Sequence, residues 1–143
     1  MITSGEFARR LTAAAVHDFA AGVGGVDGVF GIAQWFPGAA EDPELGPTEA
    51  DFLSEYSRLV GSAPDYPAVQ AMAGAVLATR CAELAGSVAR EALWEAAASL
   101  ETSTLFGDFK VDPSTGVQTK HVPVLLRWQG ESLGLVEKPR LDQ

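Results

Sequence analysis

Gln34 and Trp35 end a strongly apolar run and carry side chains that could bind a small molecule. The run, GVFGIAQW, covers residues 28–35 and is typical of a strand buried on both faces, as in parallel sheets. Ligands of open α/β sheets bind beside the carboxyl ends of strands. A tryptophan there can stack on a solute, and a glutamine amide both donates and accepts hydrogen bonds. We predict that both residues bind a ligand; the alternative is that Trp35 only seals the strand end against the next helix.

Asp65 and Tyr66 form a second candidate pair, in the link SAPDYP that precedes a long predicted helix. The first turn of a helix presents free amides and the positive end of the helix dipole. A polar contact to a solute from the Asp65 carboxylate or the Tyr66 hydroxyl is therefore the functional interpretation. The alternative is that Asp65 only caps the helix.

The other polar residues predict neither an enzyme nor a metal site. The carboxylates between residues 41 and 55 lie in a Pro/Gly loop or at a helix start, where negative charge suits the dipole. His17 and His121 are far apart in the sequence and have no further ligands at metal-binding spacing. Gly24 and Gly25 precede a strand, the reverse of the order in a phosphate-binding loop. We therefore predict no catalytic residue, no metal and no cofactor.

Composition is that of a globular chain of about one domain, with 143 residues, 47% of them hydrophobic, and a net charge of −9. Nucleic-acid binding needs a basic surface, so it is excluded. The single cysteine, Cys81, rules out an internal disulfide and lies among Ala and Leu, as a buried inert thiol would. No apolar run is long enough to span a bilayer. The first residues lack the apolar region of a secretory signal, which taken alone predicts a cytoplasmic chain.

Local patterns predict the element order α-β-α-α-α-β-β. Apolar periodicity, caps and glycine stops indicate the helices, and a change to strand-like patterns indicates the tail. The predicted helices cover 5–22, 48–61, 66–85 and 88–100, and the predicted strands cover 28–35, 105–112 and 122–130, with DPSTG as a tight turn between the last two.

The predicted strand at 28–35 lacks neighbours in this chain. Such a strand needs helices on both faces, and sheets of this kind hold about 5–6 strands. The predicted tail strands cannot pair its edges and also cover the helices at 66–85 and 88–100. We infer that the polypeptide is part of a larger unit or assembles with a second copy.

Four segments carry a resemblance to a known family: GVFGIAQWFPG, LSEYSRLVGSAPDYPAVQAMAGAVLATRCAELAGS, REALWEAAASL and LFGDFKVDPSTGVQTKHVPVLLRWQG. Their order and spacing resemble the C-terminal part of type I periplasmic solute-binding proteins of ABC transporters. The branched-chain amino-acid and amide receptors are the most similar group. The likeness covers nearly all of this chain and about the last third of a full family member, so most of both lobes and the signal or anchor segment lie outside it.

The resemblance implies an α/β fold of two lobes joined by three crossing strands, with the solute in the cleft between the lobes. Residues 1–63 would be the remainder of the second lobe, 64–120 the remainder of the first lobe, and 121–143 the last crossing strand and the tail. The expected fold class is thus a partial type I periplasmic-binding-protein-like fold with an incomplete sheet.

The resemblance also implies the function, which is binding without catalysis. The chain would be an extracytoplasmic solute-binding component of an ABC-type importer, or a fragment of one, and would bind an amino acid, an amide or a similar small polar solute and dock on an ABC permease. The alternative is a stand-alone sensor or interaction remnant of the same fold, without a transport role. Such a chain would dimerise through its uncovered apolar surface and, as a complete product, would be cytoplasmic.

Overall fold

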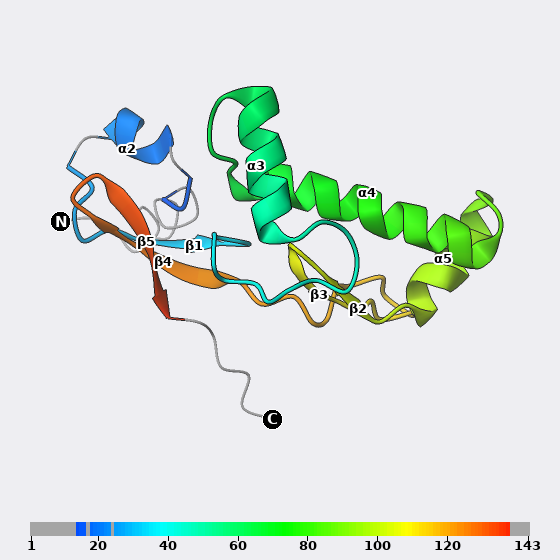
Figure 1. Cartoon of the computed structure of the whole chain (residues 1–143). Helices are drawn as coiled ribbons and strands as arrows, with labels where there is room; N and C mark the ends of the chain where they lie inside the picture. Colours follow the sequence, from blue (N-terminus) through cyan, green and yellow to red (C-terminus); the bar gives the residue numbers. More distant parts are fainter. Residues whose placement is uncertain (1–13, 17, 24, 138–143) are drawn as a thin grey trace. The chain divides into compact units, whose positions relative to one another are not determined.

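The computed structural model describes residues 14–16, 18–23 and 25–137 (Figure 1). They form two compact units: unit 1 takes in the described residues up to Ala39 and from Pro123 on, and unit 2 is Ala40–Val122. In chain order the elements are α2 (Asp18–Val23), β1 (Phe30–Ala33), α3 (Glu49–Val60), α4 (Tyr66–Ala85), α5 (Arg90–Ser99), β2 (Thr102–Thr104), β3 (Gly107–Phe109), β4 (Val124–Gln129) and β5 (Ser132–Glu137).

Two helices of unit 2, α3 and α4, begin and end close to their local signals. Thr48 is the N-cap of α3, and its hydroxyl accepts a hydrogen bond from the backbone amide of Asp51 at 3.2 Å. Pro67 lies in the first turn of α4, where its missing N–H costs nothing. Gly61 and Gly86 end α3 and α4 with positive φ angles, which glycine adopts without strain. The predicted ranges of these two helices are confirmed.

The helix predicted over residues 5–22 lies largely outside the described residues, including its proposed cap, Ser4. Within the described part, residues 14–16 form a turn and α2 begins at Asp18. The glycine-rich segment after α2 leads into β1, as predicted.

Unit 1 is built on an antiparallel sheet with the strand order β1-β4-β5. One face of the sheet is buried and carries Ala33, Val124, Leu126 and Trp128. Residues 14–15 pack on this face, and Trp128 donates a hydrogen bond from Nε1 to the carbonyl oxygen of Ala14 at 2.7 Å.

The opposite face of this sheet is open, and it corrects the expectation for residues 28–35. Phe30 and Ile32 are 38% and 48% exposed, and Leu125, which pairs with Ile32, is 40% exposed. We call these three side chains the open face of unit 1. The strand was expected to be parallel and buried on both faces; it is antiparallel to β4 and buried on one. Residues 28–35 place apolar side chains on both sides of the strand, but residue type does not decide burial. A side of the strand is buried only where another part of the protein covers it.

The tail also differs from the expected pairing. The predicted hairpin of residues 105–112 with 122–130 is wrong, because β2 pairs with β3 and β4 pairs with β1 and β5. Strand β5 forms where the local pattern predicts none. The DPSTG turn is confirmed, since an antiparallel bridge joins Val111 and Gln118 across it. Strand pairing here is decided by partners remote in sequence, which local patterns do not reveal.

The boundaries of the two units differ in part from the predicted lobes. Residues 40–63, which include α3, group with α4 and α5 in unit 2 rather than with β1. The second boundary, at 122–123, lies within two residues of the predicted one. The assignment of these segments to particular lobes stays a prediction.

Candidate functional site

The first predicted ligand-binding pair follows β1 in unit 1. Trp35 is only 3% exposed and Gln34 is half-buried, so the alternation of β1 continues and Trp35 falls on the buried side with Ala33. The Nε1–H of Trp35 has no hydrogen-bond partner within the described part of the chain. A ring buried to this degree offers no open face for a solute to stack on. Its remaining polar contribution is the N–H group.

The second predicted pair begins α4 in unit 2. Asp65 occupies the N-cap position in an extended conformation, but its side chain makes no capping hydrogen bond to the helix. Tyr66 is the first helical residue, and both side chains are half-buried. The alternative interpretation, that Asp65 caps α4 with its side chain, is therefore wrong. The two pairs belong to different units, and ligand binding by the four residues stays a prediction.

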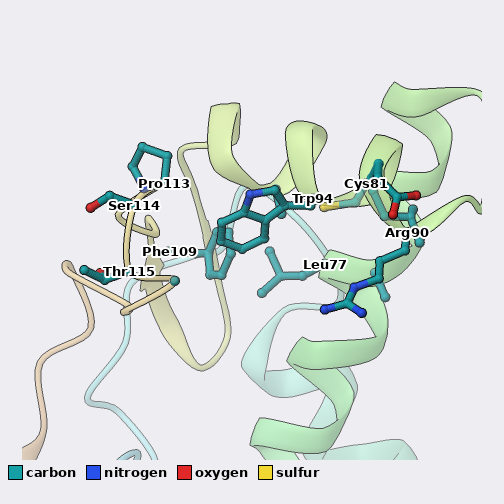
Figure 2. A pocket seen from close by; sticks show the side chains of 13 residues that line it. Leu77, Cys81, Arg90, Trp94, Phe109, Pro113, Ser114 and Thr115 are labelled. Atoms are coloured by element: carbon teal, nitrogen blue, oxygen red, sulfur yellow. The ribbon is translucent and has the colours of Figure 1, made fainter.

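Unit 2 also contains an open groove of about 800 Å³ between α4, α5 and the loop after β3 (Figure 2). The sequence analysis did not predict it. Its walls are mostly apolar, with one Arg and one Glu at the start of α5. The lining residues are Leu77, Ala78, Cys81, Arg90, Glu91, Leu93, Trp94, Ala97, Phe109, Pro113, Ser114, Thr115 and Gly116.

Trp94 is the largest side chain that lines this groove. Figure 2 shows its indole beside Phe109 and Leu77, with the loop residues Ser114 and Thr115 across the opening. The ring approaches the loop closely, since a Cβ placed on Gly116 would lie 3.5 Å from its Cη2 atom. Trp94 remains 42% exposed. A large aromatic residue beside the apolar stripe of a helix is the only sequence signal that could have indicated the groove.

The thiol of Cys81 lies in the wall of the groove and is buried, with 5% exposed. Burial raises the pKa of this thiol, because the thiolate would lose its hydration. The thiol form is therefore favoured at neutral pH, and the prediction of a buried cysteine is confirmed.

The loop that closes the groove is ordered by Asp112. One carboxylate oxygen accepts hydrogen bonds from the Ser114 hydroxyl at 2.5 Å, the Ser114 amide at 2.7 Å and the Thr115 amide at 3.0 Å. These bonds favour the ionised form and lower the pKa of Asp112. Further along, Lys120 donates a hydrogen bond to Glu101, which lowers the pKa of Glu101 and raises that of Lys120.

Within the described ranges, no group of three or more His, Cys, Asp or Glu residues is placed to hold a metal ion. His121 instead stacks on Phe106, with ring centroids 4.5 Å apart. Among the helices described, none has the length and apolar character needed to cross a membrane.

Residues 7–131 match the family model described as periplasmic binding protein. The chain belongs to this family. The family is one of binding proteins. The resemblance inferred from the order of the segments is thereby confirmed. No curated relative matches the sequence.

Two solved structures share the fold. A leucine binding protein, LivK, from Thermotoga maritima matches with a TM-score of 0.68 and 20% identity over 87% of this chain. A putative branched-chain amino acid ABC transporter from Rhodospirillum rubrum matches with a TM-score of 0.62 and 24% identity over 85% of this chain. The chain spans 34% of the length of each. The likeness confirms the expected fold class, part of a type I periplasmic binding protein.

Proposed function

We propose that this chain serves in the extracytoplasmic solute-binding component of an ABC-type importer. The solute is an amino acid, an amide or a similar small polar molecule, bound in a cleft between two lobes, and the partner is an ABC permease. The single observation that carries the proposal is the family match over residues 7–131. The likeness to LivK, a leucine binding protein, supports an amino acid as the first solute to test.

Four side chains supply the polar groups in this proposal: Gln34, Trp35, Asp65 and Tyr66. The Gln34 amide can bond either end of an amino acid, because it has both donors and an acceptor. The Asp65 carboxylate would accept from an ammonium or amide N–H group. The Tyr66 hydroxyl can do either. Each is half-buried or more, so each bond would form in a partly desolvated setting.

Isothermal titration calorimetry of the chain against L-leucine, L-valine, acetamide and urea tests the proposal directly. We expect one of these solutes to give a saturable heat. The same solute should raise the stability of the protein, by about 2.7 kcal/mol at a concentration 100-fold above Kd. A folded chain that gives neither a heat nor a thermal shift with any of the four would contradict the proposal.

Replacing Gln34 provides the matched variant. Gln34→Ala removes one hydrogen-bonding side chain, so the Kd should rise about 10-fold. Gln129→Ala is the control, because Gln129 is the exposed last residue of β4. Equal affinities of the two variants would remove Gln34 from the site while leaving the calorimetric result in place.

The open face of unit 1 favours a second candidate function, a dimerising sensor or interaction module. Phe30, Ile32 and Leu125 present neighbouring apolar side chains to solvent on one sheet. Contiguous exposed apolar surface commonly marks an interaction site. This candidate requires association of the chain through that face, which the oligomeric state of suitable variants reports.

A further inference from the structure

The groove of unit 2 has the size and the wall chemistry of a small-molecule site. Its volume of about 800 Å³ lies within the range of roughly 300–1,000 Å³ that is common for ligand pockets, and its walls are mostly apolar with a few polar groups. All residues of unit 2, Ala40–Val122, are described, so each wall of the groove is placed. None of the four predicted ligand-binding residues lines this groove.

One face of α5 supplies the groove with an aromatic ring and a charge. Arg90, Leu93, Trp94 and Ala97 recur at the helical spacing i, i+3, i+4 and i+7, and all four line the groove. Trp94 lies beside Phe109 and is 42% exposed (Figure 2). Part of the indole is therefore accessible to a ligand, and a flat aromatic ring is the group that stacks best on it.

Arg90 differs from the other cations of unit 2 in having no carboxylate partner. The remaining Lys and Arg residues of this unit all form ion pairs: Arg58 with Glu55, Arg80 with Glu83, and Lys110 and Lys120 with Glu101. Arg90 forms no ion pair with any described residue. Its guanidinium can bind a carboxylate through two parallel hydrogen bonds.

Negative charges of the protein limit the charge of such a ligand. Glu91 also lines the groove, but it follows Arg90 by one residue and so lies about 100° further around the helix, at the edge of the lining face. The whole chain carries a net charge of −9. A ligand with one negative charge therefore meets less repulsion than a polyanion does.

We propose that the groove of unit 2 binds a small aromatic monocarboxylate, with its ring against Trp94 and Phe109 and its carboxylate on Arg90. This site is additional to the solute cleft of the proposed function and does not depend on it. The apolar walls supply affinity for the ring, and the guanidinium selects the acid over neutral molecules of the same shape.

Calorimetry with 1-naphthylacetate and 1-naphthylacetamide separates stacking from the ionic contact, because the two share a ring and differ in charge. The carboxylate should bind with a Kd about 10-fold lower than that of the amide. Arg90→Gln should abolish this preference and leave the Kd of the amide unchanged. Arg58→Gln removes the same charge from α3 of the same unit and should leave both Kd values unchanged. No binding of either compound, or equal Kd values for the two, would overturn the inference.

Nuclear magnetic resonance locates the bound ligand. The chain has three tryptophans, and Trp94→Phe identifies the indole N–H signal of Trp94 by its loss. Addition of 1-naphthylacetate should move that signal and leave those of Trp35 and Trp128, which are 3% and 2% exposed, in place. A bound ligand that leaves the Trp94 signal unmoved would overturn the inference.

Analytical ultracentrifugation distinguishes a ligand site from an interface between copies of the chain. A groove that is free for a ligand predicts the same oligomeric state for the wild type and for Trp94→Ala. Association of the wild type that Trp94→Ala abolishes would show that a second copy fills the groove, and this would overturn the inference. Binding of L-leucine without binding of 1-naphthylacetate would refute the inference alone, whereas the reverse result would refute only a role for L-leucine in the proposed function.

Discussion

Gly31 lets the backbone of residues 14–15 reach the buried face of the unit 1 sheet. A Cβ on Gly31 would lie 2.8 Å from the carbonyl carbon of Ala14 and from the amide nitrogen of Ala15. Both are backbone atoms, which cannot turn aside as a flexible side chain does. The same segment accepts the Trp128 hydrogen bond, so one glycine and one indole hold this layer in place.

Gly31→Ala should therefore lower the free energy of unfolding by about 1–3 kcal/mol through overpacking. Gly134→Ala is the control, since Gly134 lies in β5 of the same sheet and a Cβ there meets nothing within 4 Å. Its effect should stay within about 0.5 kcal/mol. Urea unfolding followed by tryptophan fluorescence measures both. Equal stabilities of the two variants would contradict the close packing at Gly31.

At the scale of elements, the loop after β3 shows how a short segment is ordered without regular structure. Asp112 accepts three hydrogen bonds within the next three residues, and the Gly116 amide donates to the Asp112 carbonyl oxygen at 2.8 Å. Gly116 adopts a φ of 73°, which favours glycine. This turn brings the loop against Trp94 and forms one wall of the groove.

The order of this loop should depend on pH. The folded protein lowers the pKa of Asp112, so the carboxylate stabilises the fold at pH above its unfolded pKa. This contribution is lost as the pH falls through the lowered, folded pKa. Carboxyl-carbon nuclear magnetic resonance should show Asp112 titrating below its usual range, with the loop signals moving at the same midpoint. Asp112→Asn keeps an acceptor oxygen but does not ionise, so its loop signals should not follow that titration; an ordinary pKa for Asp112 would contradict the argument.

At the scale of the whole molecule, the open face of unit 1 is the feature least expected of a chain that acts alone, because its apolar side chains are exposed to solvent. Strand β1 ends the sheet, and its outer edge pairs with no other described strand. Its exposed side is apolar and includes Phe30. The Cζ atom of Arg127 lies 5.5 Å from the centre of the Phe30 ring. The chain also spans only about a third of the length of the structures that share its fold. Both facts agree with a surface adapted to a covering element.

Self-association should follow from that surface. Ile32 is 48% exposed at its centre, so Ile32→Lys should shift the chain toward the monomer by placing a charge in the contact. Gln70→Lys adds the same charge at an exposed position of α4, outside this sheet, and should leave association unchanged. Analytical ultracentrifugation over a wide range of concentration measures both. A wild-type chain that stays monomeric throughout would contradict the dimeric candidate.

The boundaries of α3 and α4 were the part of this fold that the sequence predicted well. These boundaries depend on residues no more than one helical turn away. Thr48 caps α3 with its side chain, and Pro67 supplies a fixed φ angle in the first turn of α4. Gly61 and Gly86 end the two helices with positive φ angles. The candidate site was predictable only as residue types. Whether the Trp35 ring is open for stacking, and whether Asp65 caps α4, depends on burial and geometry that neighbouring residues do not encode.

The sequence by itself determined the three long helices, the DPSTG turn, the buried cysteine and membership of the periplasmic binding protein family. Those features rest on interactions between residues a few positions apart, or on the order of segments along the chain. Only the tertiary structure decided that β1 runs antiparallel to β4, that one face of their sheet is open, that β5 forms and that the Trp35 ring is buried. Pairing and burial join residues up to about a hundred positions apart, such as Ile32 and Leu125, and are chosen by which surfaces meet in space.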